Sequence, residues 1–315
     1  MEVEFTKAKY STRVFAFSFD LLCMVISALL MILGSRAIVG ELPFYKDALD
    51  TMQRVEIESG LYVETPSGNA MTLYEYYEPS DILDVTLANQ NIDEKLQAFY
   101  ANSEYFPEND GISLYNKAKL DSGYYVYEDD THTNIVLTPN VDNNAVYEFL
   151  KSVCDNDAKQ KMITNGDYIS SVKTLNLSYV FLVLLVPIVL SIIIYEFIFP
   201  VIFRRGRKTL GKLVFKIAVV DSRGLTPTFG RFMARFGLLA IVELLLSAVT
   251  FCIPLIVSFT MLAVGKKQQS FHDYVAGTYV VDASTCNIFL NEKEYIEAHK
   301  KADEFELKKE DVSLF

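Results

Sequence analysis

Three long apolar stretches separate the polar parts of this chain, at residues 14–39, 176–203 and 236–264. A helix needs about 20 mostly apolar residues to cross the hydrocarbon core of a membrane. The first two stretches meet that requirement, so the pattern predicts one transmembrane helix in each. As a single helix the third would reach about 44 Å, which is longer than one crossing and shorter than two.

The third stretch has two interpretations. Arg231 and Arg235 precede it, and Lys266 and Lys267 follow it. Basic residues are enriched on the cytoplasmic side of membrane helices, so this distribution favours a short helical hairpin that turns near Thr250–Pro254 with both ends inside. A single tilted span would instead place the C-terminus outside.

Acidic residues concentrate between the first two apolar stretches. The chain has a net charge of -11, and residues 41–175 hold 24 acidic and nine basic residues. Residues 40–175 therefore read as one inserted domain, which is large enough to bury its own core. Alternation of apolar and polar positions predicts an α+β domain. Its expected strands are Leu73–Tyr77, Gly123–Glu128 and Thr133–Leu137, and its expected helices are 81–105 and 143–164.

Two candidate features of the insert have ordinary explanations. Six tyrosines gather near the expected strands, and core packing accounts for them more simply than a binding groove does. The acidic triplet Glu128, Asp129 and Asp130 lacks the spacing of a calcium-binding EF-hand loop, so we expect no metal there.

The basic cluster after the second apolar stretch fixes the expected orientation. Arg204, Arg205, Arg207 and Lys208 mark a cytoplasmic end. The predicted fold class is an α-helical integral membrane domain with three or four transmembrane helices and an inserted α+β extracytoplasmic domain, in a multi-pass protein of the cell membrane. The expected cytoplasmic parts are residues 1–13, the basic and amphipathic loop 204–235, and 265–315, which ends in a charged tail.

Several function classes are disfavoured. No long basic face exists to meet phosphates, which argues against nucleic acid. The four cysteines form no CxxC pair or Cys/His cluster, so we expect no zinc site and no cofactor. No nucleophile motif accompanies the adjacent His272 and Asp273, so we expect no catalytic residues and no enzymatic activity.

Carboxylates inside apolar stretches are the main candidate chemistry. Asp20 lies well inside the first stretch, and Glu243 lies in the third. A charged side chain in a membrane is costly and should face a partner or water. The functional interpretation is a cluster of buried carboxylates with basic partners that binds a cation or relays protons. The alternative is a structural contact, such as Asp20 with Arg235. For Glu196, near the inner end of the second stretch, we favour the structural role.

The segment 211–220 combines apolar and basic positions. Lys208, Lys212 and Lys216 are four residues apart, which places them on one face of a helix. This spacing predicts an amphipathic element that lies on anionic lipid head groups.

Three pieces of the chain resemble the RDD family of membrane proteins, which is named for one arginine and two aspartates. RVFAFSFD resembles the opening R-x-x-A-x-x-x-D, carried here by Arg13, Ala16 and Asp20. The segments GRKTLGK and VVDSRG and the closing HDYVAGT resemble the later motifs of the family. The residues that carry these later motifs are Lys208, Gly211, Lys212, Asp221, Arg231, Arg235, His272 and Asp273. Lys216 and Ala218 depart from the family's pattern, and the insert is far longer than the loop usual there.

The resemblance implies a membrane role in which cation–proton exchange has been proposed. Arg13, Asp20, Glu243 and Asp273 would then form the ion, proton or structural polar network. Three or four spans are few for a transporter, so we expect a homo-oligomer or a membrane protein partner. The alternative is a membrane-anchored binding or sensory module. For His272 and Asp273 we favour a structural role, with Asp273 paired to Arg231 or Lys212.

Overall fold

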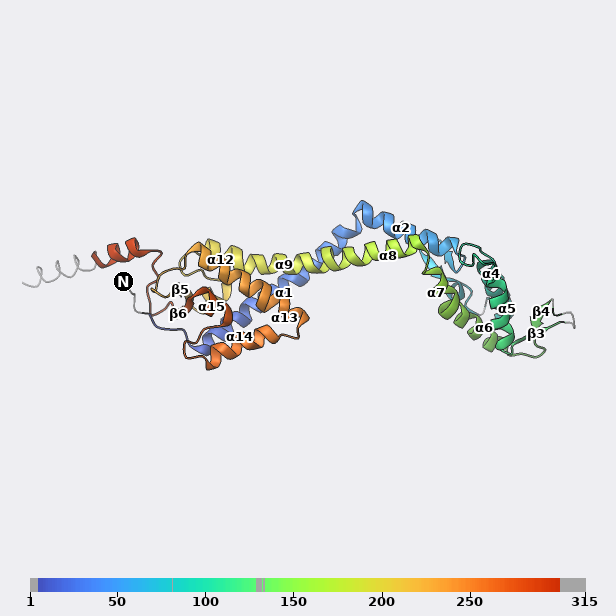
Figure 1. The fold of residues 1–315 in the computed structure, drawn as a ribbon. Helices are drawn as coiled ribbons and strands as arrows, with labels where there is room; N and C mark the ends of the chain where they lie inside the picture. Colours follow the sequence, from blue (N-terminus) through green and yellow to red (C-terminus); the bar gives the residue numbers. More distant parts are fainter. Residues whose placement is uncertain (1–4, 81, 129–131, 133, 301–315) are drawn as a thin grey trace, which may run out of the picture. The chain divides into compact units, whose positions relative to one another are not determined.

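The computed structural model describes residues 5–80, 82–128, 132 and 134–300. The chain divides into two compact units. The first consists of residues 1–35 and 183–315, and the second of residues 36–182. Figure 1 shows the elements that make up each unit.

Among the described residues, three helices are long and apolar enough to cross a membrane. They are α1 (Tyr10–Gly40), the continuous run Gly166–Ile202 and the run Phe229–Val249. The fold class is therefore confirmed as mostly helical with small separate strands. The second run consists of α8 (Gly166–Ser178), η2 (Tyr179–Leu185), α9 (Val186–Ile193), η3 (Ile194–Ile198) and α10 (Phe199–Ile202). The third consists of α12 (Phe229–Gly237), η4 (Leu238–Leu245) and α13 (Leu246–Val249).

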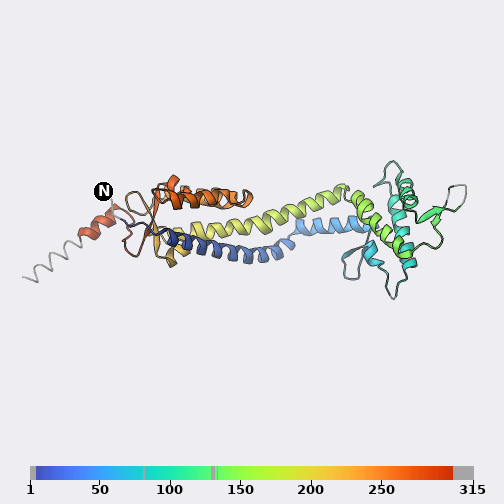
Figure 2. The same cartoon turned by 90° about the horizontal axis from the view of Figure 1, so that it is seen from below.

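The second run begins ten residues before the predicted span at 176. Asn165 explains the earlier start, because its side chain accepts hydrogen bonds from the backbone N–H groups of Asp167 and Tyr168. Further along, α9 lies beside α1 in both views (Figures 1 and 2). Ser191 donates to the carbonyl of Met24 at 2.7 Å, which satisfies a polar side chain within two apolar helices.

The apolar segment 236–264 forms two helices joined by a tight turn. α14 (Ile253–Val264) follows α13 after residues 250–252, and Phe251 and Cys252 both have positive φ. Thr250 donates to the carbonyl of Leu246 at 2.7 Å, and the backbone of Cys252 donates to Ser247 at 2.9 Å. The turn thus satisfies its own polar groups, as an apolar surrounding requires.

The segment predicted to be an amphipathic helix is split into a short helix, a turn and a strand, so the prediction of a lysine face at 208–216 is wrong. α11 (Leu210–Val214) lasts little more than one turn, and Lys216 has positive φ. β5 (Ile217–Asp221) then pairs antiparallel with β6 (Thr278–Asp282), from Ile217 opposite Asp282 to Asp221 opposite Thr278. Valines and isoleucine suit a buried strand, and all five residues of β5 are buried. The short helix α15 (Phe271–Ala276) precedes β6.

The second unit has its own hydrophobic core, which includes the fully buried side chains of Leu73, Ile92, Tyr115 and Leu150. Its helices are α2 (Pro43–Glu58), α3 (Leu73–Tyr76), α4 (Val85–Tyr100), α5 (Gly111–Asp121), α6 (Asn143–Ser152), η1 (Val153–Ala158), α7 (Lys159–Met162) and α8. Its two hairpins are β1 (Tyr62–Glu64) with β2 (Ala70–Thr72), and β3 (Tyr125–Tyr127) with β4 (Ile135–Leu137).

The predicted strand Leu73–Tyr77 is wrong, because those residues form α3. Thr72 and Glu75 make a reciprocal capping box that starts a helix there. The hairpin of β3 and β4 is confirmed, and so is the helical segment from Asn143, where Asp142 accepts a hydrogen bond from Asn144 as its cap. Of the acidic triplet, Asp129 and Asp130 lie outside the described residues, as does the charged tail from 301 onward.

Candidate functional site

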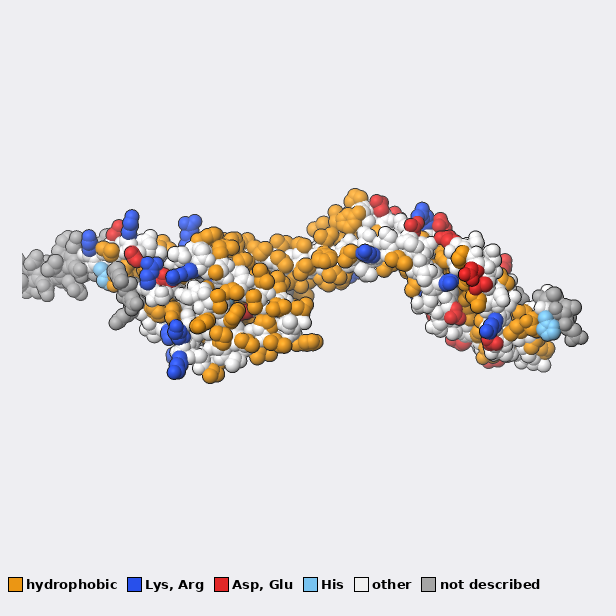
Figure 3. Space-filling model, viewed as in Figure 1, with side chains coloured by type: hydrophobic (Ala, Val, Ile, Leu, Met, Phe, Trp, Pro, Cys, Tyr) orange, Lys and Arg blue, Asp and Glu red, His pale blue; other side chains and the backbone are white. Residues whose placement is uncertain are grey.

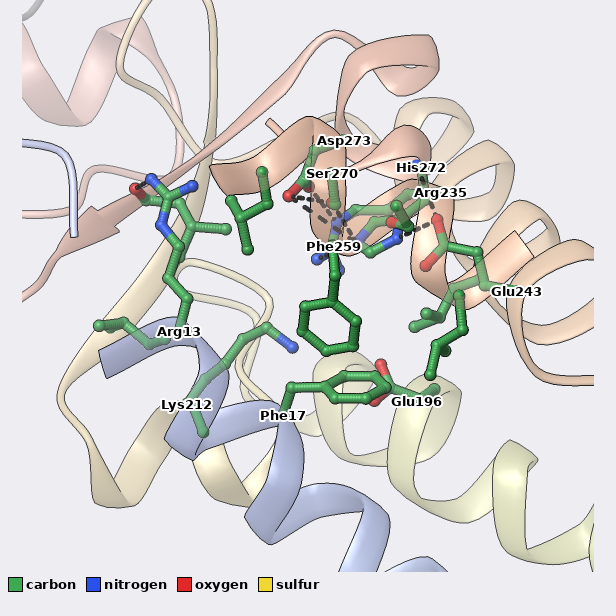
Figure 4. A pocket seen from close by; sticks show the side chains of 17 residues that line it. Arg13, Phe17, Glu196, Lys212, Arg235, Glu243, Phe259, Ser270, His272 and Asp273 are labelled. Carbon is green, nitrogen blue, oxygen red and sulfur yellow. Dashed lines mark hydrogen bonds and ion pairs between the residues drawn. The ribbon is translucent and has the colours of Figure 1, made fainter. Parts of the chain in front are cut away.

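A small cavity lies among the helices of the first unit. Its volume is about 70 Å³, which is enough for a few water molecules. α1, η3, α11, η4, α14 and α15 all contribute side chains to its wall. Most predicted site residues line this space or adjoin it, although the sequence scatters them between residues 13 and 273 (Figure 4).

Arg235 and Asp273 form a buried ion pair beside the cavity. The Nε atom of Arg235 donates to Asp273 at 2.8 Å. Thr278 donates to the same carboxylate oxygen, and Ser270 donates to the other, each at 2.8 Å. Burial alone raises the pKa of Asp273, but the charge of Arg235 and these hydrogen bonds hold it below its ordinary value. The sequence-based pairing of Asp273 with Arg231 or Lys212 is therefore wrong.

His272 links this pair to Glu243. Its Nδ1 atom lies 2.8 Å from a carboxylate oxygen of Glu243, and its Nε2 atom lies 3.1 Å from a guanidinium nitrogen of Arg235. Because a guanidinium only donates, Nε2 must accept, which places the ring proton on Nδ1 facing Glu243. The backbone N–H of His272 also donates to Glu243 at 3.0 Å. Glu243 is thus held by α15.

Asp20 is fully buried and joins α1 to α11. Its carboxylate accepts a hydrogen bond from the backbone N–H of Gly211 at 2.6 Å and another from the hydroxyl of Thr209. Thr209 also accepts from the Lys212 ammonium group at 3.1 Å. The suggested contact between Asp20 and Arg235 is wrong, since each has other partners.

Arg13 does not extend to an outer surface. Its side chain is buried and donates to two backbone carbonyls, those of Gln268 and Val280. Val280 belongs to β6, so Arg13 fastens the start of α1 to the small sheet. Its Nε atom is buried without a hydrogen-bond partner among the residues that the structure describes.

Arg231 and Lys208 lie away from the cavity wall. Arg231 pairs with Asp221 at 3.3 Å, which stabilises the turn after β5. Lys208 is half-buried, and burial lowers the pKa of its ammonium group. Neither residue lines the cavity.

The residue that sequence reasoning undervalued is Glu196. Only 3% of its surface is exposed, it lines the cavity, and within the described chain its carboxylate has no hydrogen bond or ion pair. Figure 4 shows Glu196 and Lys212 directed toward the space around Phe17 and Phe259. Its position near the end of an apolar stretch suggested an interfacial residue, and only the packing of α1 and α11 around it reveals the burial.

The site holds charged groups without the arrangement of a metal centre. In the described ranges, no three His, Cys, Asp or Glu side chains come together as metal ligands. The groups left for chemistry are the carboxylate of Glu196 and the ammonium group of Lys212, in a space large enough for water.

A comparison with protein-family models matches the part of the chain that carries most of this site. Residues 153–277 match the RDD family. The matched range includes Glu196, Arg235, Glu243 and His272–Asp273, whereas α1 with Arg13 and Asp20 precedes it. No curated protein and no solved structure matches the chain.

Proposed function

Because the chain carries an RDD family membrane domain at residues 153–277, we propose that it exchanges protons for a small cation through the cavity beside Glu196. The unpaired carboxylate of Glu196 carries this proposal. Asp20, Glu243 and Asp273 already accept hydrogen bonds from protein donors, so their role is to hold the helices together.

A buried carboxylate without a partner is unfavourable when charged. Glu196 therefore gains from binding either a proton or a cation, and the two compete for one carboxylate. This competition is the physical basis of exchange. The sequence pointed to Asp20, Glu243 and Asp273 as the exchanging carboxylates, and each of them already accepts hydrogen bonds from the protein. In Glu196, by contrast, both carboxylate oxygens are without a hydrogen-bond donor among the described residues.

Lys212 supports the exchange from the opposite side of the cavity. Its ammonium group is buried, and its one hydrogen-bond partner in the described residues is Thr209. A fixed positive charge in a small space disfavours a divalent cation, so the proposed cargo is monovalent.

The test is proton flux in sealed vesicles that contain the purified protein. A pulse of sodium or potassium chloride should release protons from vesicles with the native chain. Glu196→Gln should abolish the release, because a neutral amide holds no exchangeable charge. Glu41→Gln, which alters an exposed residue paired to Lys46, is the matched control and should retain it. Flux above half of the native rate in Glu196→Gln would overturn the proposal.

The orientation that accompanies this proposal puts the N-terminus and residues 204–235 in the cytoplasm and the second unit outside, in the cell membrane. Its support is the basic cluster at 204–208 and the acidity of residues 41–175. In a chain without its native cysteines, Ser67→Cys should react with an impermeant maleimide in intact cells, and Ser222→Cys should react only after lysis. The reverse pattern would overturn the orientation. We also propose a homo-oligomer, which cross-linking in membranes would reveal.

A membrane-anchored binding or sensory module is the second candidate, and the separate core of the second unit favours it. That unit also has a groove of about 430 Å³ beside Tyr100, Leu114 and Lys161. If binding is the function, the native protein will move no cation in vesicles, and a ligand will raise the unfolding temperature of the second unit. Neither candidate assigns an enzymatic reaction.

A further inference from the structure

A second cavity of the first unit, on its surface, has the character of an anion site. This groove, here called the Arg207 groove, has a volume of about 620 Å³. The loop after α10, the turn after β5, the start of α12 and residues 290–293 line it. It shares no lining residue with the cavity beside Glu196. We propose that it binds the phosphate group of an anionic phospholipid.

Positive charge in the groove exceeds what the protein neutralises. Arg223 pairs with Asp221 at 3.1 Å and with Glu292 at 2.7 Å. Arg204 and Arg207 also line the groove, and neither has a carboxylate partner in the part of the chain that the structure describes. Two guanidinium groups are therefore left to attract an anion.

Arg207 is held in place without being neutralised. Its guanidinium carbon lies 4.9 Å from the ring centre of Phe232 and 6.0 Å from that of Phe229. Such contacts orient the group and leave its N–H donors available. Its Nε atom is buried and has no hydrogen-bond partner within the described ranges. Burial, together with the charge of Arg204, lowers the pKa of Arg207. A bound anion would offset the unfavourable electrostatic energy of this positive charge.

The start of α12 adds backbone donors. Thr228 occupies the cap position of this nine-residue helix, but its side chain makes no capping hydrogen bond. The first N–H groups of a helix lack intrahelical partners and favour negative charge. A phosphate has several strong acceptor oxygens, which suit both guanidinium forks and helix N–H groups.

The groove lies where two apolar helices end, which favours a lipid as the source of the phosphate. Ile202 ends one candidate span and is 63% exposed, and Phe229 begins another and is 56% exposed. Figure 3 shows that Lys and Arg side chains of the first unit gather toward one end, next to a surface on which many hydrophobic side chains are exposed. A head group in the groove would leave its acyl chains against that apolar surface.

This site differs from the lysine face expected from the sequence. Lys212 of that expected face is buried beside the cavity, and β5 replaces the helix that would have aligned it with Lys216. The groove instead uses arginines from two separate loops, and the backbone N–H of Val219 in β5 donates to the carbonyl of Gly206 in the first of them at 2.8 Å.

The experiment measures phosphatidylglycerol binding to the full-length protein in detergent by native mass spectrometry, with phosphatidylcholine as the neutral lipid. Arg204→Gln and Arg207→Gln should each weaken phosphatidylglycerol binding about tenfold. Arg205→Gln is the matched control, because Arg205 lies in the same loop but pairs with Glu294 and does not line the groove. It should change binding less than twofold. The unfolding temperatures of the variants show whether each of them folds. If Arg207→Gln does not fold, Arg204→Gln still tests the inference, because Arg204 is exposed.

Three outcomes would overturn the inference. Equal binding of the two lipids would show that the groove does not select anions. An equal loss in Arg205→Gln would show that general surface charge is responsible. Equal protection against unfolding by millimolar inorganic phosphate and by phosphatidylglycerol would also overturn the inference. It would identify a soluble phosphate compound, rather than a lipid, as the ligand.

Discussion

The carboxylate of Asp20 accepts a hydrogen bond from the backbone N–H of Gly211 at 2.6 Å, across 191 positions of sequence. This contact ties α1 to the start of α11, and the approach is so close that the glycine hydrogen is the only side chain that fits. A Cβ atom at Gly211 would overlap the carbonyl oxygen of Ala16 and press on Asp20 itself.

Gly211→Ala should therefore destabilise the first unit. Overpacking of this kind costs about 1–3 kcal/mol, because backbone rather than a flexible side chain has to move. Gly34→Ala is the control, since nothing lies within 4 Å of a Cβ at that position of α1. Unfolding in detergent, followed by the reactivity of Cys23 toward a maleimide, measures both. Equal stability of the two variants would contradict the close contact.

The ion pair of Arg235 and Asp273 should make the stability of the first unit depend on pH. Asp273 has a folded-state pKa below its ordinary 3.8, so its stabilisation is fully present above that pH and is lost as the pH falls through the folded value. Asp273→Asn leaves a buried guanidinium without its counter-charge and should cost about 3–5 kcal/mol near neutral pH.

Thermal unfolding of both proteins across pH tests this linkage. The gap between native and Asp273→Asn unfolding temperatures should stay constant from about pH 7 to pH 5 and narrow below about pH 4. Asp47→Asn, at an exposed position of α2, should show no gap. A gap that widens toward acid would contradict the assignment of a depressed pKa.

The sequence predicted the helices well because their signals are local. Apolar length alone identified the segments of α1 and α9, and the spacing of apolar residues identified the helical segment that begins at Asn143. Local signals failed where tertiary pairing decided the outcome. Lysines spaced by four favoured a helix at 211–220, but pairing with β6 made Ile217–Asp221 a strand.

The candidate site shows the same contrast between local signals, which the sequence contains, and tertiary contacts, which it does not. The polar residues were recognised as a group from their places in apolar stretches and from the family motifs. Their partners were not, because Asp20 and Arg235 each had several possible partners at the same membrane depth. Glu196 was undervalued for the same reason, since a lack of partners is a property of the folded packing and leaves no mark in the sequence.

Glu56 of α2 offers a pH test in the second unit. Burial raises its pKa above the ordinary 4.5, against the opposing effects of Tyr168 and Lys159. The charged form is therefore disfavoured in the fold, and stability should increase as the pH falls from neutral toward 4.5. Glu56→Gln should be more stable than the native protein at pH 7 and lose this advantage near pH 4.5. Glu58→Gln, exposed on the same helix, should change neither value. A less stable Glu56→Gln at pH 7 would refute the raised pKa.

Substitution of one buried and one exposed isoleucine tests how much core packing contributes to the stability of the second unit. Ile92 on α4 is fully buried, whereas Ile82, in the loop before it, is 98% exposed. Ile92→Ala removes apolar contacts in the core and should cost about 2–5 kcal/mol, while Ile82→Ala should stay within about 0.5 kcal/mol of the native protein. Hydrogen exchange of α4 and α6 measures the change, with exchange of η4 in the first unit as an internal reference. Because the second unit has its own core, protection in η4 should stay at the native level in both variants. If Ile92→Ala lowers protection equally in α6 and η4, the two units unfold together and the division of the chain into independent cores is wrong.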